Sequence, residues 1–252
     1  MHTNRNNELE LQLDIMPFYL DFEKQYPLSQ IVSCMIHASG EHANYYGFGI
    51  ESLMKRGISW VLSRMTIDFV KPVIVSRPLS IITGVSSWSG LGTNRVIRLA
   101  QDGMPVADAN SKWVAIDMKK RMPVNIESIL TDPAIRSDYT GVTVPEMPKR
   151  LWNIEVQERL EPIYKHVVRY SDLDLNCHVN TAVWISLAMD AIPIEKIRHN
   201  RVKRAHLRFI KEGRAGDELV IHTFQTADAV CVQINCDEAS YFQLLVEWNR
   251  EC

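Results

Sequence analysis

The sequence lacks the marks of several protein classes. No apolar run approaches the roughly 20 residues that a bilayer-spanning helix needs. The formal net charge is only −2, so nothing global attracts the chain to nucleic acid or to an anionic membrane. The five cysteines are odd in number and have no CxxC spacing, which argues against a disulfide framework and against a zinc site. These absences favour a globular protein that has no nucleic-acid or membrane partner.

A recognisable targeting signal is also missing. Residues 1–14 are polar, and they contain neither the apolar core of a secretory signal nor the Arg- and Ser-rich pattern of a transit peptide. We therefore expect a cytoplasmic location. Apolar residues make up 46% of the 252 residues and charged residues 23%, which is typical of globular proteins. This length allows one large domain or two of ordinary size.

Two segments without formal charge predict buried helices. Residues 29–40 and 179–189 are apolar nearly all round, as expected of helices that a sheet covers. A short surface helix is expected at 50–56. Alternating apolar positions and β-branched residues predict strands. The segments expected as strands are 16–24, 65–69, 79–88, 94–101, 106–117 and 163–170.

The order of these elements occurs twice. With a shift of 140, residues 63–83 align with residues 203–223 without a gap, and Phe69 coincides with Phe209. Each half consists of a strand, an uncharged helix and a run of strands, which indicates an internal duplication. The predicted class is α+β, in which an antiparallel sheet wraps around a long central helix in each half.

The segment 171–180, SDLDLNCHVN, leads into the second uncharged helix. If it is extended, Asp174, Asn176 and His178 project from one face and form a candidate catalytic cluster. A polar turn that caps the helix is an alternative. A calcium loop is another, although Cys177 stands where an EF-hand needs glycine. Cys177 is poorly placed to be activated as a nucleophile by His178, because adjacent residues of an extended segment face opposite ways.

The duplication helps to separate structure from chemistry, because the fold needs its features twice and a reaction needs its residues once. Residues 24–27, before the first uncharged helix, contain no cluster of this kind. In the second half Glu212 aligns with Pro72 of the first. The duplication therefore favours catalysis over a pure scaffold role for the polar cluster, which stays the alternative.

The cluster resembles the D-x-N-x-H-V-N signature of acyl-acyl carrier protein thioesterases of the plant and bacterial fatty-acid type. Residues 207–212, LRFIKE, resemble the second signature of that family, L-E-Y-R-R-E, and the 34 residues from His178 to Glu212 fit its spacing. Residues 60–67, WVLSRMTI, resemble its first-domain motif W-V-x-x-R-M-x-I. Residues 93–95 and 111–114 fit as well, and the resemblance covers about 16–250.

The resemblance implies two tandem hotdog domains and hydrolysis of the thioester between a fatty acyl chain and its carrier protein. The expected limits are 1–120 for an acyl-binding domain, 121–160 for a linker and 161–252 for a catalytic domain. An acyl-CoA thioesterase and a non-catalytic acyl-binding protein of the same fold are the alternatives. The resemblance implies no metal or organic cofactor. The acyl-loaded carrier protein is the expected partner, and a homodimer is allowed.

By position, the implied catalytic set is Asp174, Asn176, His178 and Glu212. Plant members carry a cysteine after the glutamate, whereas this chain has Gly213, so a carboxylate must do the work here. Glu212 or Asp174 is expected to activate water. His178 is expected to assist the leaving thiolate, and N–H groups at the start of the 179–189 helix are expected to stabilise the oxyanion.

Basic residues near the candidate site in sequence are expected to dock an acidic carrier protein, although such runs are more often plain solvated surface. They are Arg198, Arg201, Lys203, Arg204, Lys211 and Arg214.

Overall fold

A computed structural model describes residues 2–3, 7–75, 77–128 and 144–250. The chain divides into two compact units. The first contains residues 1–26 and 33–146, and the second contains residues 27–32 and 147–252. Among the described helices, none is long and apolar enough to cross a bilayer.

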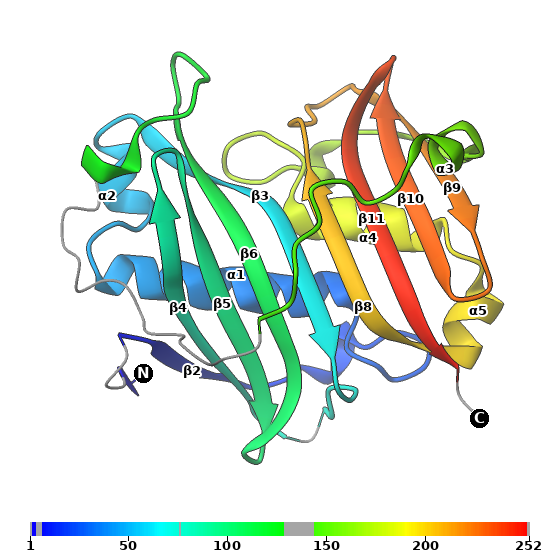
Figure 1. Cartoon of the computed structure of the whole chain (residues 1–252), viewed down its shortest axis with the longest axis horizontal. Helices are drawn as coiled ribbons and strands as arrows, with labels where there is room; N and C mark the ends of the chain where they lie inside the picture. The colour runs from blue at the N-terminus through cyan, green and yellow to red at the C-terminus, as the bar shows by residue number, and fades with distance from the viewer. Residues whose placement is uncertain (1, 4–6, 76, 129–143, 251–252) are drawn as a thin grey trace. The chain divides into compact units, whose positions relative to one another are not determined.

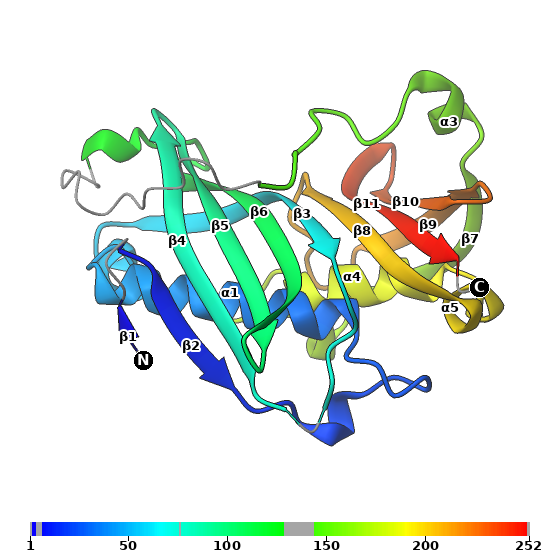
Figure 2. The same ribbon diagram turned by 60° about the horizontal axis from the view of Figure 1, so that its bottom comes forward.

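The first unit is an antiparallel sheet with a long helix on one face (Figures 1 and 2). The strand order is β1-β2-β4-β5-β6-β3. The strands are β1 (His2–Thr3), β2 (Leu9–Leu13), β3 (Ile58–Phe69), β4 (Leu79–Ser89), β5 (Gly92–Gln101) and β6 (Met104–Asp117). The helices are η1 (Pro17–Tyr19), α1 (Leu28–Tyr45), most of which belongs to this unit, α2 (Ile50–Met54) and η2 (Ile126–Ser128).

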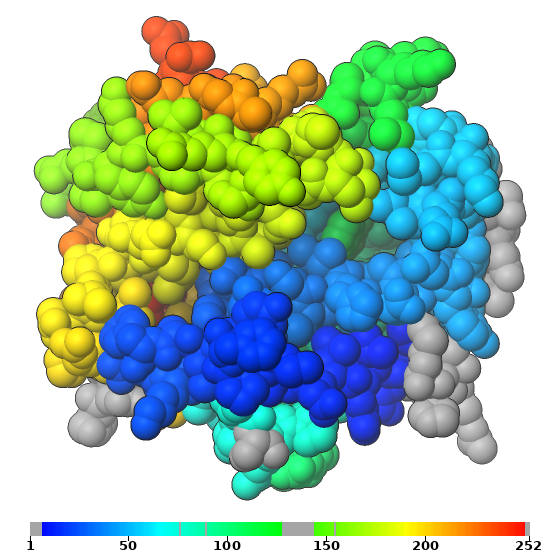
Figure 3. Space-filling model, turned by 180° about the vertical axis from the view of Figure 1, so that it is seen from behind, coloured from blue at the N-terminus to red at the C-terminus, as the bar shows by residue number. Residues whose placement is uncertain are grey.

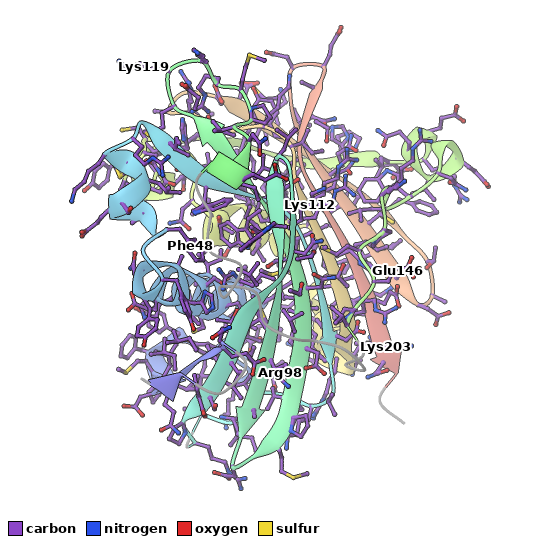
Figure 4. All side chains as sticks on the ribbon, turned by 60° about the vertical axis from the view of Figure 1, so that its left-hand side comes forward. Phe48, Arg98, Lys112, Lys119, Glu146 and Lys203 are labelled. Carbon is purple, nitrogen blue, oxygen red and sulfur yellow. The ribbon has the colours of Figure 1, made fainter. Side chains whose placement is uncertain are left out.

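One face of this sheet packs on α1. Val85 of β4 and Ala115 of β6 lie in one buried cluster with Ala43 of α1, and Phe48 joins the cluster just beyond the helix (Figure 4). The same face of the sheet includes Ile97 of β5, which is fully buried. The absence of charge from most of α1 is explained by this burial, because a charged side chain would lose its hydration there.

The second unit repeats the architecture with a shorter helix, α4, which packs on β10 and β11. Its strand order is β7-β9-β10-β11-β8, and all neighbouring pairs are antiparallel. The strands are β7 (Glu161–Val167), β8 (Asn200–Phe209), β9 (Glu218–Gln225), β10 (Ala229–Cys236) and β11 (Ala239–Arg250). The helices are α3 (Ile154–Glu158), η4 (Tyr170–Asp172), α4 (Thr181–Asp190) and α5 (Ile194–His199).

The two units have the same topology, which bears out the internal duplication. The order β2-β4-β5-β6-β3 in the first corresponds strand by strand to β7-β9-β10-β11-β8 in the second. The shift of 140 also holds in register, because Ile67 and Leu207 are buried at equivalent places on β3 and β8. The predicted α+β class is confirmed.

One predicted strand is wrong. Residues 16–24 contain the 3-10 turn η1 instead, with Phe18 and Tyr19 exposed. The strand lies earlier, at Leu9–Leu13, where leucine alternates with polar residues. Its polar positions hid it, since a strand that faces the core on one side turns only alternate side chains toward it. The helix predicted at 29–40 extends to Tyr45.

The predicted domain limits stay a prediction. The first predicted domain ends at residue 120 and the second begins at 161, with a linker between them. Residues 129–143 of that linker lie outside the described part of the chain.

Candidate active site

The candidate cluster lies on a closed loop between β7 and α4. The Asn180 N–H donates to the Asp172 carbonyl at 2.8 Å, and the Asp174 N–H donates to the His178 carbonyl at 2.8 Å. Between these bonds, Leu173 and Val179 form an antiparallel bridge. Yellow-green atoms, the colour of residues near 175, lie at the surface in Figure 3. The loop is thus a small hairpin with a rigid base.

Asp174 shapes the tip of this hairpin. Its Oδ1 accepts hydrogen bonds from the N–H groups of Asn176, at 2.8 Å, and His178, at 3.2 Å. Cys177 has a left-handed backbone with a φ of 60°. The extended conformation expected from the alternating residues is therefore wrong, because a side chain that bonds to its own backbone forms a turn here.

Asn180 forms the base of α4. Its side chain accepts a hydrogen bond from the Ala182 N–H at 2.8 Å, which is an N-cap. The N–H groups of Val183 and Trp184 donate to the Asn180 carbonyl. The N–H groups at the start of this helix were expected to stabilise an oxyanion. Thr181 is the residue that still fits this expectation, because its N–H makes no hydrogen bond with another described residue.

Glu212 follows β8 and meets His178. The Val179 N–H donates to the Gly213 carbonyl at 2.9 Å and so joins the two loops. Nε2 of His178 then lies 3.1 Å from Oε2 of Glu212. The His178 side chain is 19% exposed and that of Glu212 is 28% exposed, so both are partly accessible to solvent. The structure thus brings together two residues separated by 34 positions in the sequence.

At Gly213 the two loops are closely packed. A Cβ there would stand 2.7 Å from Cγ2 of Val179 and 2.8 Å from Cζ2 of Trp184. Such distances leave no space for a side chain. The position that is cysteine in plant members of the resembled family is therefore closed to any larger residue in this chain, unless the packing shifts.

The two remaining polar residues of the loop differ. Asn176 is half-buried, and within residues 144–250 its amide makes no hydrogen bond to Asp174, His178 or Glu212. Cys177 is exposed. The calcium-loop alternative fails, because Asp172 and Asp174 already accept protein N–H bonds. The described residues also contain no group of three or more His, Cys, Asp or Glu side chains placed to hold a metal ion.

Asp172 joins the loop to β7. Its Oδ2 accepts from His166 Nε2 and from the Arg169 N–H, both at 2.8 Å. Although burial raises the pKa of Asp172, the hydrogen bonds from Arg169 and His166 outweigh it and leave the pKa lowered. The pKa of Asp190 is raised, because the effect of burial exceeds the lowering effect of the charge of His166. No sequence motif singles out His166 or its contact with Asp172.

The basic residues proposed for docking are divided by the structure. Lys211 and Arg214 flank Glu212 and are exposed. Arg201 and Lys203 lie near the start of β8, where Figure 4 labels Lys203, whereas Glu212 follows the end of this strand. Strand residues rise about 3.3 Å each, so the ends of β8 are roughly 30 Å apart. Closeness in sequence was misleading, because the extended strand β8 separates these residues from Glu212.

Comparison with known proteins matches most of the chain to one family. The model of the acyl-ACP thioesterase N-terminal domain, where ACP is acyl carrier protein, matches residues 9–133. The model of the C-terminal domain matches residues 157–248. The crystal structure of an acyl-ACP thioesterase from Bacteroides thetaiotaomicron is 25% identical, covers 97% of this chain and 98% of its own, and superposes with a TM-score of 0.84. The 12:0-ACP thioesterase of Umbellularia californica, 15% identical, covers 98% and 99% with a TM-score of 0.82 and supports the fold.

Relatives in plants match over a shorter share of their length. The chloroplastic oleoyl-acyl carrier protein thioesterase of Coriandrum sativum is 24% identical over 219 residues, which is 79% of this chain. The chloroplastic oleoyl-acyl carrier protein thioesterase 2 of Arabidopsis thaliana is 25% identical over 222 residues, or 81% of this chain. The chain spans 58% and 59% of the length of these two relatives. The predicted tandem hotdog fold is confirmed, and the chain belongs to the acyl-ACP thioesterase family.

Proposed function

We propose that this protein hydrolyses the thioester between a fatty acyl chain and its carrier protein, which releases free fatty acid and ends chain elongation. The observation that supports this most is the contact of 3.1 Å between His178 and Glu212, two accessible residues in a chain of this family. A carboxylate beside an imidazole can move protons during attack by water on a carbonyl carbon. Membership of the family makes an acyl thioester the natural substrate.

Glu212 is the proposed general base. It takes a proton from water while the water oxygen bonds to the carbonyl carbon, and the carbon–sulfur bond then breaks. His178 delivers a proton to the leaving thiolate, so the products are a carboxylic acid and a thiol. Asp174 has a different role, because its Oδ1 already holds the N–H groups of Asn176 and His178. It keeps the loop in shape and thereby aims His178.

Two donors are proposed for the oxygen of the thioester carbonyl. The Asn176 amide can donate a hydrogen bond to this oxygen or to the attacking water. The Thr181 N–H at the start of α4 can donate as well, and the dipole of this ten-residue helix favours the negative charge that develops there. Asp174, Asn176, His178 and Glu212 then form the catalytic machinery.

The acyl chain is proposed to lie in the first unit, on the face of the sheet that packs on α1. Where β6 and β11 occupy equivalent places, β6 carries small side chains and β11 carries large ones. The small ones are Ala107, Ala109 and Ser111, and the large ones are Phe242, Leu244 and Val246. All six are fully buried. The acyl chain is proposed to lie beside the helix, where these small side chains line the sheet.

The proposed partner is the acyl-loaded carrier protein, with a cytoplasmic location. Of the six basic residues expected to dock an acidic carrier, Lys211 and Arg214 are kept in the proposal because they flank Glu212. Reversal of Lys211 and Arg214 to Glu should raise KM for the acyl-carrier substrate and leave hydrolysis of small acyl thioesters unchanged. An equal loss on both substrates would argue against docking at these residues.

A homodimer remains part of the proposal and can be tested by sedimentation.

The test is an assay of thiol release on acyl-carrier and acyl-CoA substrates of several chain lengths. Stoichiometric release of thiol and free fatty acid, faster with the carrier substrate, is the expected result. Faster turnover of the CoA substrates would indicate an acyl-CoA thioesterase. Binding of both substrates without thiol release would overturn the proposal in favour of an acyl-binding protein.

A further inference from the structure

A histidine outside the proposed catalytic set is hydrogen-bonded to the loop that carries His178. His166 lies on β7, and its Nε2 is 2.8 Å from Oδ2 of Asp172. Asp172 is only 9% exposed, and its carboxylate also accepts the Arg169 N–H. A hydrogen bond to a buried carboxylate is stronger than one between neutral groups, so this contact holds its two partners firmly.

The contact continues through the backbone to the catalytic loop. The carbonyl of Asp172 accepts the N–H of Asn180, the residue that caps α4. One residue further along each side of the loop, Leu173 and Val179 form an antiparallel bridge. His178 is the next residue. Only one residue pair therefore separates the Asp172 anchor from the imidazole that meets Glu212.

The first unit supplies an internal comparison. His166 pairs in register with Leu219 on β9, and Leu13 of β2 pairs with Leu79 on β4. Leu79 and Leu219 are related by the shift of 140, so Leu13 is the counterpart of His166. The fold is built with leucine at this place in the unit that lacks the cluster. A histidine appears only in the unit that has it, which points to a role in the reaction and not in the sheet.

We propose that His166, acting through Asp172, is a positioning residue that fixes the loop and holds His178 against Glu212. This inference rests on the proposed function. Without the bond from His166, the Asp172 carboxylate loses one of its two donors and the loop gains freedom to move. A displacement of about 1 Å at a proton-transfer group is enough to slow catalysis by about 100-fold.

The first test follows the His178 ring directly and needs no turnover. Ring C–H resonances of His178 are measured by NMR in the wild type and in the His166→Leu, His166→Gln and Lys165→Met variants. We expect shifted or broadened signals only in His166→Leu, because glutamine retains an N–H donor near the position of Nε2. Lys165 is the matched control, since it pairs with Glu218 in solvent on the opposite face of the same strand. Unchanged His178 signals in His166→Leu would overturn the proposal.

The second test separates positioning from a stability effect. In His166→Leu we expect kcat to fall by about 10- to 100-fold with KM within twofold, measured at a temperature where thermal unfolding shows the variant folded. His166→Gln should recover most of this loss, and Lys165→Met should match the wild type. A His166→Leu kcat equal to that of the wild type, or no recovery in His166→Gln, would overturn the proposal. If the wild type itself releases no thiol, the proposed function fails and the NMR result still decides the positioning role.

Discussion

Pro72 and Glu212 follow equivalent strands in the two units, but one cannot titrate and the other contacts His178. Three residues before α1 stands Gln25, and three residues before α4 stands His178. The strand order and the buried register are nevertheless the same in both units. The difference teaches that a duplicated scaffold can be kept in both copies while a contacting histidine and carboxylate are present in only one of them.

Histidines of the two units also differ in their burial. His42 on α1 is fully buried, and its Nε2 contacts the Asn7 carbonyl at 2.9 Å. Burial and the charge of Arg95 lower the pKa of His42 to about 3, although the bond to Asn7 raises it. Buried among apolar residues, it stays neutral at ordinary pH, whereas His178 is partly exposed beside a carboxylate. A histidine in a protein of this family is therefore not by itself a catalytic candidate.

The largest expected effect separates the two carboxylates of the second unit. Glu212→Gln should lower kcat by roughly 1,000-fold, because general-base catalysis is removed. Asp174→Asn should lower it by less than about 10-fold, since an amide oxygen still accepts the two backbone N–H bonds of the turn. Steady-state thiol release measures both. A larger loss in Asp174→Asn than in Glu212→Gln would exchange the proposed roles.

The next effect concerns the buried histidine of the first unit. His42 in the folded protein resists protonation down to about pH 3, whereas the unfolded chain binds a proton below about 6.5. Its contribution to the free energy of unfolding is therefore present above pH 6.5 and is lost as the pH falls, by roughly 2–3 kcal/mol at pH 4.5. Urea unfolding of His42→Gln should show a shallower loss between these pH values. The exposed His199→Gln serves as the control, and equal slopes in all three proteins would contradict the account.

A smaller effect is expected at the contact between the two loops. Gly213→Ala should reduce the free energy of unfolding by about 1–3 kcal/mol, because its Cβ would meet Val179 and Trp184. Gly40→Ala is the matched control, as the space around Gly40 is open and it lies within α1. That change should be neutral or stabilise by about 0.5–1 kcal/mol. Thermal unfolding that ranks Gly213→Ala as stable as Gly40→Ala would show that the loops have room to move apart.

The smallest effect concerns the acyl chain. Ala109→Leu copies into the first unit the leucine that the second has at the equivalent position, Leu244. We expect kcat/KM for the longest accepted chain to fall about 10-fold, or about 1.4 kcal/mol, with shorter chains unaffected. Leu244→Ala should instead cost about 2–4 kcal/mol of stability with the chain-length preference unchanged. If only Leu244→Ala changed the acyl-chain-length preference, the acyl chain would lie in the second unit instead.

Much of the fold could be predicted because its signals are local. Uncharged runs marked α1 and α4, and the repeat at a shift of 140 predicted two copies of one topology. Leu9–Leu13 escaped notice because its polar positions lowered its mean hydropathy, although its alternation was present. Its partner strand β4 lies about 70 residues away, so no local pattern reports the pairing.

The candidate site was only partly predictable. The family resemblance implied that His178 and Glu212 belong to one site, and the structure places their side chains in contact, on a loop before α4 and a loop after β8. The shape of the loop was missed, because the Asp174 side chain bonds to its own backbone and Cys177 adopts a left-handed conformation. His166 was missed for a related reason. Its role depends on one contact across a turn, and no periodicity reports such a contact.

The measurement that tests the central claim most directly compares matched double variants of the two units in one thiol-release assay with an acyl-carrier substrate. His178→Ala with Glu212→Gln removes the proposed proton-transfer pair, and Gln25→Ala with Pro72→Ala changes the equivalent positions of the first unit. The account predicts that the first protein, still folded, loses at least about 1,000-fold in kcat and that the second stays within a few-fold of the wild type. Turnover that survives in the first protein, or disappears equally in both, would contradict it.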